Sequence, residues 1–236
     1  MILSLKRINA IFIKDWKDLL KNSYILSTFA MPILFAAMLG RMDAEGPAVY
    51  TLPINLALVI CGAFIQAAMV AEEKEKNTLR SLLLSPANIG EVFIGKSALS
   101  AVVTIIAVAL TISISDFQVP DLSLFLLVVL LNIIIFISIG TALGLVSRSV
   151  METTIIGIPV LAVFGMGSMV KGMFENDFLL ELVSYLPSEQ LNTVAIELNN
   201  GGGMTAIQDN LLVLLVWAVI SIAVCVITFK KRRFDK

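Results

Sequence analysis

The chain has 236 residues and a net charge of −1, with 58% hydrophobic and only 15% charged side chains. Soluble domains carry about a quarter charged residues, so this composition indicates a membrane protein. The sequence contains no histidine and two cysteines, Cys61 and Cys225, both inside apolar runs. We therefore expect no metal site, no disulfide and no catalytic residues in this chain, and no nucleic-acid partner.

Six apolar runs without a charged residue recur along the chain. A helix needs about 17–25 residues to cross the hydrocarbon layer, and helices satisfy their own backbone hydrogen bonds in lipid. We therefore predict one all-α membrane domain, residues 1–236, with spans at about 24–40, 52–71, 97–115, 122–146, 153–172 and 211–229.

The positive charges are distributed unevenly between the two ends of these spans. Of the 17 Lys and Arg residues, all except Arg41 and Lys171 would lie on the side that holds both termini. Because basic residues concentrate in cytoplasmic segments, we predict that both termini are cytoplasmic. The expected location is the bacterial cytoplasmic (inner or plasma) membrane, which the chain would cross several times.

An amphipathic helix is predicted at residues 4–22, before the first span. Its apolar stripe contains Phe12 and Trp16, while Lys14 and Lys17 fall on the opposite face. Such a helix lies in the headgroup layer with its apolar side toward the lipid. It would serve either as a surface anchor or as a lever joined to the first span, and the pattern leaves both open.

The most charged inner segment is the loop at residues 72–96, with the sequence EEKEKNTLRSLLLSPANIGEVFIGK. The spacing of Glu72 and Lys76 favours a short helix, which we expect to end before Pro86. An apolar patch rimmed by charge often binds a protein partner; the alternative is a loop helix packed against its own bundle. The patch would consist of Leu79, Leu82 and Leu83.

Residues 90–97 of this loop fit the phosphate-loop pattern G-x-x-x-x-G-K-[ST]. A true phosphate loop follows a buried strand and opens a soluble helix, whereas a membrane span follows here. We therefore expect no ATP binding by this segment. Lys96 is interpreted as an anchor at the start of the third span, with its charge at the membrane interface.

The outer segment at residues 175–200 is predicted to form a hairpin of two short helices before the last span. Apolar residues recur at helical spacing on both sides of Pro187, and Asp177 and Ser188 occupy the expected N-cap positions. Each helix is too short to cross the membrane. The hairpin either dips into the outer leaflet or caps the bundle; alternatively, its helices lie in the interface without a role in transport.

The apolar runs behind these spans contain no charged residue, since the fifth run is Thr153–Val170 and ends before Lys171, which argues against a secondary transporter driven by protons or ions. Energy would therefore come from another subunit that acts on the inner surface. Seven positions within the spans carry a proline, a side-chain amide, a glycine or a methionine. They mark either a dimer interface and substrate path or ordinary helix packing. These positions are Pro32, Gln66, Asn132, Pro159, Gly165, Met166 and Met169.

The loop at residues 72–96 resembles the signature of ABC-2 type permeases, the membrane subunits of type V ABC exporters. The matching residues run from Glu72 through Leu79, followed by Leu82-Leu83, Ser85-Pro86 and Gly95-Lys96. Asn77 departs from the glycine that is common in the family, although asparagine also tolerates left-handed backbone geometry. The predicted elbow helix, six spans, outer hairpin and basic tail agree with the family's layout.

This resemblance implies a permease without an ATPase site of its own, in contact with membrane lipid, so ATP and Mg²⁺ would bind a partner ATPase subunit. The chain would pair with a second permease, as a homodimer or heterodimer. Its substrate would be hydrophobic or amphipathic, such as an antimicrobial or toxin peptide, a lipid-like molecule or a drug, and would move outward.

The loop helix would be the coupling helix, seated on the ATPase subunit. The coupling residues would be Glu72, Glu73, Glu75, Asn77, Thr78, Leu79, Leu82, Leu83, Pro86 and Lys96. The alternatives to an exporter are a six-span scaffold or sensor without transport, and a secondary transporter.

Overall fold

The computed structural model describes residues 4–41, 47–76, 78, 88–119, 121–167 and 176–232. Within these ranges every regular element is a helix, which confirms the predicted all-α class. In chain order the elements are α1 (Leu5–Lys21), α2 (Ser23–Leu39), α3 (Pro47–Ala57), the π-helical stretch η1 (Leu58–Phe64), α4 (Ile65–Glu75), α6 (Ile89–Ile114), α7 (Leu122–Val146), α8 (Val150–Gly165), α10 (Asp177–Ser184), α11 (Pro187–Asn199) and α12 (Met204–Arg232).

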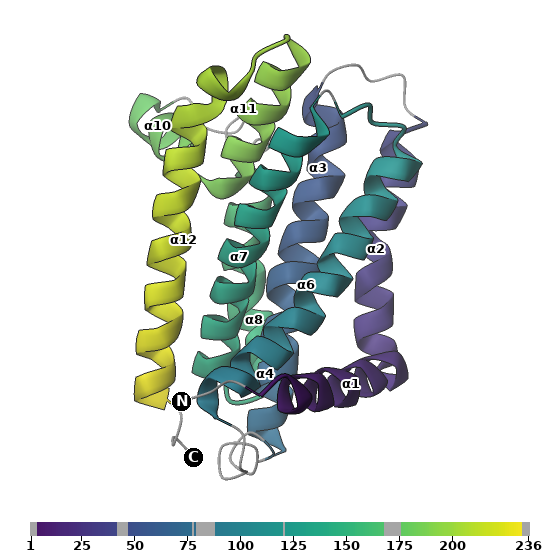
Figure 1. Cartoon of the computed structure of the whole chain (residues 1–236), viewed down its shortest axis with the longest axis vertical. Helices are drawn as coiled ribbons and strands as arrows, with labels where there is room; N and C mark the ends of the chain where they lie inside the picture. The colour runs from purple at the N-terminus through teal and green to yellow at the C-terminus, as the bar shows by residue number, and fades with distance from the viewer. Residues whose placement is uncertain are drawn as a thin grey trace.

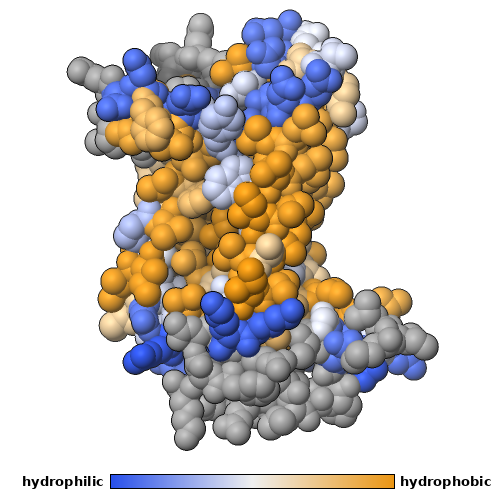
Figure 2. Space-filling model, turned by 90° about the vertical axis from the view of Figure 1, so that its left-hand side faces the viewer, coloured by the Kyte–Doolittle hydropathy of each residue, from blue (hydrophilic) through white to orange (hydrophobic). Residues whose placement is uncertain are grey.

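Several helices are long and apolar enough to cross a membrane. Four qualify directly, and the pair α1 and α2 adds a fifth if the two count as one bent span. Helices α2 and α8, with 17 and 16 residues, reach about 24–26 Å at 1.5 Å per residue, slightly less than the hydrocarbon layer. Apolar side chains form a band between two polar ends (Figure 2). The chain is therefore a multi-pass membrane protein, while the count of six spans stays a prediction.

Helix α1 lies across one end of the bundle and is bent by 83° from α2 (Figure 1). We call this end the α1 end. Ile11, Asp15 and Leu19, four residues apart, are buried. The rings of Phe12 and Trp16 stack at 6.2 Å on the same side. The helix is amphipathic as predicted, but its inner face packs on α6, whereas the sequence alone assigned that face to lipid.

Most helices extend past the apolar runs from which the spans were predicted. The helix that includes α4 continues through Glu75, and α6 begins at Ile89. The reason at α6 is a capping box, in which Asn88 and Glu91 satisfy each other's backbone amides well before the apolar run starts. The segment predicted as a loop at 72–96 is therefore helical at both ends. Its middle, residues 77 and 79–87, lies outside the described residues.

The fourth span matches its prediction, whereas the fifth and sixth differ. Helix α7 occupies 122–146 as expected, but α8 ends at Gly165, before the predicted end at 172, and residues 168–175 lie outside the described part. Helix α12 runs from Met204 to Arg232, longer than the predicted 211–229. Polar residues extend a helix freely once its ends reach water, so hydropathy marks the hydrocarbon layer and not the helix ends.

The predicted hairpin is formed by α10 and α11, at the end of the bundle opposite α1 (Figure 1). The predicted N-caps are wrong by one or two positions. Asn176 caps α10 through its side chain, and Leu186 precedes Pro187, which is the first residue of α11. Proline suits this position because its missing N–H would have no helical partner there. Helix α11 buries Leu191, Val194, Ala195 and Leu198 in the main core, so it caps the bundle.

The continuous helix α3–η1–α4 is the centre of the fold. Its apolar stretch is 89% buried, compared with 22% for that of α12. Helix α7 packs closely along it, because Gly140 presents no side chain; a Cβ atom there would overlap the backbone of Ala63 in η1. The central helix thus links the α10–α11 end to the α1 end through the middle of the protein.

Candidate functional site

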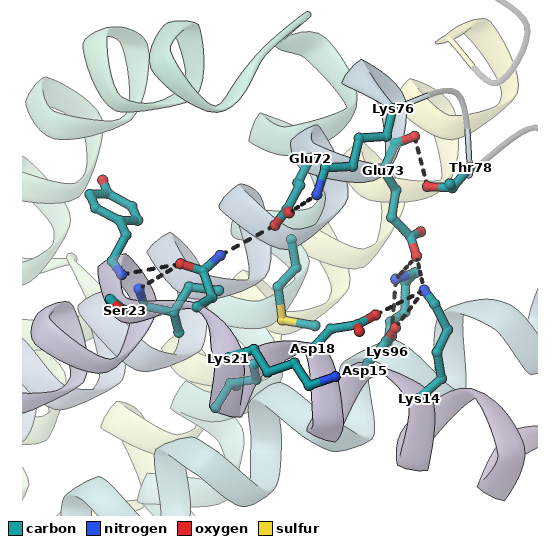
Figure 3. A pocket seen from close by; sticks show the side chains of 15 residues that line it. Lys14, Asp15, Asp18, Lys21, Ser23, Glu72, Glu73, Lys76, Thr78 and Lys96 are labelled. Carbon is teal, nitrogen blue, oxygen red and sulfur yellow. Dashed lines mark hydrogen bonds and ion pairs between the residues drawn. The ribbon is translucent and has the colours of Figure 1, made fainter.

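Four charged side chains meet where α1 crosses the ends of α4 and α6 (Figure 3). The Lys96 Nζ atom lies 3.0 Å from Asp15 Oδ2 and 2.8 Å from Glu73 Oε1. Lys14 Nζ lies 2.8 Å from the same Glu73 oxygen and 3.0 Å from Asp15 Oδ1. These four residues, which we call the ion cluster, join α1, α4 and α6.

Three members of the ion cluster are almost fully removed from solvent. The side chains of Lys96, Asp15 and Glu73 are 2%, 3% and 9% exposed, whereas that of Lys14 is 46% exposed. Buried charges are tolerated only when they are paired and hydrogen-bonded, and here two cations face two anions. Burial lowers the pKa of Lys14, but its hydrogen bond to Glu73 and the charges of Glu73 and Asp15 outweigh this and hold the pKa above its usual range.

A glycine and a second acidic residue fasten α1 in position over the cluster. A Cβ atom on Gly95 would lie 3.0 Å from side-chain atoms of Ile11, so glycine permits the close crossing of α1 and α6. Glu91 accepts a 2.7 Å hydrogen bond from the Ser4 backbone N–H and pairs with Arg7 at 3.3 Å. Helix α1 is therefore attached to α6 both at its start and at its middle.

The segment 90–97 that fits the phosphate-loop pattern lies entirely within α6. Its lysine is engaged by two carboxylates, so the segment has neither the loop nor the free cation that phosphate binding requires. Lys96 was interpreted as an interface anchor that reaches toward water. Instead it is buried beneath α1, because the helix that covers it cannot be recognised as a neighbour from the sequence.

The four consecutive charges at the end of α4 point to different parts of the protein. Glu72 pairs with Lys76 and accepts a hydrogen bond from Asn22, at the corner between α1 and α2. Glu73 belongs to the ion cluster. Lys74 donates to the carbonyl oxygen at the end of α7, and Glu75 accepts from the first N–H of α8. The end of α4 is thus tied to α1, α6, α7 and α8.

A polar cavity of about 630 Å³ borders the ion cluster on the side of the α1–α2 corner. Lys21 and Asp18 of α1 line it, together with Glu72, Lys76 and Thr78 (Figure 3). The Thr78 hydroxyl donates a 3.2 Å hydrogen bond to the Glu73 carbonyl oxygen. The hydrogen bond and charge of Glu72 raise the pKa of Lys76. The cavity therefore combines both signs of charge next to the first residues of the predicted coupling loop.

The predicted coupling residues fall into three groups. Glu72, Glu75 and Thr78 lie at or near the surface of the α1 end, while Glu73 and Lys96 are buried in the ion cluster. The remaining ones lie outside the described residues: Asn77, Leu79, Leu82, Leu83 and Pro86. Of the predicted elbow residues, Lys14 joins the cluster, Phe12 and Trp16 pack inward, and Lys17 is exposed.

Asp15 and Glu91 were not predicted as site residues from the sequence. Asp15 breaks the apolar stripe of α1, and an acidic residue on the buried face of an amphipathic helix signals a buried partner. Glu91 is the N3 residue of a capping box. Both signals were present in the sequence, but neither identifies Lys96 or Ser4 as the partner.

The positions predicted for a dimer interface or substrate path lie in different surroundings, and their role there stays a prediction. Gln66 is buried, where it bonds Thr141 at 2.9 Å and Ser100, and Asn132 is buried against the Val128 carbonyl oxygen. Gly165 gives close contact with Val59. Pro32 is buried, Pro159 exposed and Met166 half-buried, while Met169 lies outside the described residues. The amides and Gly165 therefore serve the packing of this chain's own helices.

Clusters of three or more Cys, Asp or Glu side chains that could hold a metal ion are absent from the described part of the chain.

No curated protein sequence matches the chain. Residues 45–227 match the family described as "ABC-2 family transporter protein". This match covers most of the chain, including the central helix, all of α6 to α11, and most of α12. The chain therefore belongs to the ABC-2 transporter family and is a membrane subunit of the permease type.

Proposed function

We propose that the chain is the permease subunit of an ATP-driven ABC exporter in the cytoplasmic membrane. It would move a hydrophobic or amphipathic substrate outward, and a separate subunit would bind Mg²⁺ and hydrolyse ATP. Family membership supports the membrane subunit. The observation that carries the coupling is the ion cluster, because it joins α1 to both ends of the segment 72–96.

The direction of the helices supports six spans. Helix α1 and the C-terminal end of α12 lie at the same end of the bundle (Figure 1), which requires an even number of crossings. Adding α2 and α8 to the four longer stretches makes six. Basic residues at the α1 end favour a cytoplasmic location for it, and the hairpin of α10 and α11 would then cap the outer side.

The ion cluster explains how a force on the loop would reach the spans. An ATPase subunit that binds residues 77–87 would push on the ends of α4 and α6, which flank this segment. Because Glu73 and Lys96 pair with α1 in a buried site, displacing one helix alone would separate buried charges at a high energetic cost. The three helices would therefore move together, with α1 as the elbow and the loop as the coupling element. A second permease chain would complete the path.

Two variants of the chain separate docking from force transmission. The double variant Leu82→Asp/Leu83→Asp should abolish co-purification of an ATPase subunit with the tagged chain from its native membrane. Glu73→Gln should leave this association intact but weaken the dependence of ATP hydrolysis on the permease, because the cluster no longer balances Lys14 and Lys96.

Leu182→Asp provides a matched control, because Leu182 is an exposed leucine on α10 at the opposite end of the bundle. It should leave both association and hydrolysis unchanged. If no ATPase subunit accompanies the wild-type chain, or if the loop variant retains it, the exporter proposal fails and a scaffold or sensor without transport becomes the better explanation.

A further inference from the structure

An apolar groove of about 410 Å³ lies between α6, α7 and α12 in the half of the bundle nearest α1. Helices α6 and α12 both pack on α7. They meet through the rings of Phe93 and Phe229, whose centroids lie 4.6 Å apart, edge to face. Ile137 of α7 and Ile222 and Val226 of α12 also line the groove. Its volume falls within the range of about 300–1,000 Å³ that is typical of small-molecule sites.

Among the described residues, a single cation lines this groove. Lys230 follows Phe229 at the end of α12 nearest α1 and contributes to the lining. It makes no ion pair with any residue in the ranges that the structure covers. The groove lining contains no acidic residue from those ranges, in contrast to the mixed charges of the cavity beside the ion cluster. An apolar groove that ends at a lysine without an ion-pair partner among the described residues matches the two parts of an anionic amphiphile.

The position of the groove along α12 indicates which class of amphiphile would bind. From Ile222 to Lys230, α12 rises about 12 Å at 1.5 Å per residue, from within its apolar run to the first residue of the basic tail. A lysine at such an edge keeps its ammonium group among lipid headgroups, where basic side chains attract anionic lipids. We propose that the groove binds one acyl chain of an anionic phospholipid from the leaflet at the α1 end, with the lipid phosphate at Lys230.

This site is separate from the proposed export function and does not depend on it. Native mass spectrometry of the purified chain, titrated with phosphatidylglycerol or with phosphatidylcholine of the same acyl chains, measures the selectivity directly. We expect preferential retention of one phosphatidylglycerol molecule. Lys230→Gln should reduce this preference about fivefold, the effect of one basic side chain at a membrane surface.

Two matched variants control for general membrane effects. Lys231→Gln removes the neighbouring charge, which does not line the groove, and should leave the retained lipid unchanged. Cys225→Phe fills the groove and should remove the bound lipid of either headgroup, whereas Val224→Phe, on the exposed side of α12, should not. Equal retention of both lipids, equal effects of the two lysine variants, or retained lipid in Cys225→Phe would overturn the proposal.

Discussion

Replacement of Lys96 by methionine tests whether the ion cluster holds α1 to the bundle. Methionine keeps most of the length and the apolar stem of the side chain but removes the charge. The side chains of Asp15 and Glu73, 3% and 9% exposed, would then share only Lys14, which is itself half-exposed. Removing one partner of a buried ion pair costs about 3–5 kcal/mol; because Lys14 remains, we expect the lower end of this range.

The free energy of unfolding in detergent micelles measures this effect. Lys17→Met is the matched control, since Lys17 is an exposed lysine on α1, the helix that the cluster holds, and it should change stability by less than about 0.5 kcal/mol. The second arm is the double variant Asp15→Asn/Lys96→Met, which leaves Lys14 and Glu73 as a balanced pair.

The double variant should be more stable than the sum of the single variants predicts, by about 1–3 kcal/mol, as for charges in direct contact. If Lys96→Met is as stable as the wild type, or if the two substitutions are simply additive, then the cluster does not couple α1 to α6. In that case the proposed transmission of force through these residues would also lose its basis.

Two other predictions address the packing and the topology. Gly140→Ala should destabilise the protein by about 1–3 kcal/mol through overpacking, because its methyl group would overlap the backbone of Ala63, whereas Gly203→Ala should not, since no atom lies within 4 Å of the added carbon; equal stability of both variants would contradict the close approach of α7 to η1. In a background without native cysteines, a membrane-impermeant maleimide should label Lys17→Cys only from the cytoplasmic side and Asn200→Cys only from the outside. Labelling of both from one side would exclude six spans.

Hydropathy and periodicity predicted much of the fold. Each apolar run lies largely in a helix where the structure describes it, because a backbone in lipid has to satisfy its own hydrogen bonds. The amphipathic α1 and the α10–α11 hairpin also follow from local patterns, since the spacing of apolar residues reports which face a helix buries. Helix ends were predicted less well, because caps such as Asn88 and Asn176 depend on a few polar residues and not on hydropathy.

The ion cluster was only partly predictable. Glu73 and Lys96 can be recognised in the sequence as charges near the ends of apolar runs. However, 23 positions separate them, and the conformation of the intervening loop cannot be predicted from the sequence. Asp15 lies further away still, 81 positions from Lys96. Their meeting depends on the 83° bend between α1 and α2 and on the close approach that Gly95 permits.

The sequence by itself determined that this chain is a multi-pass helical membrane protein and that its loop at 72–96 resembles the ABC-2 signature, because both are local patterns. Only the tertiary structure decided that Lys96 is a buried tie between α1 and α4, that Gln66 and Asn132 pack inside the chain, and that a groove ending at Lys230 opens beside α12. These features depend on which helices become neighbours, and burial and pairing energies act between residues that the chain order keeps far apart.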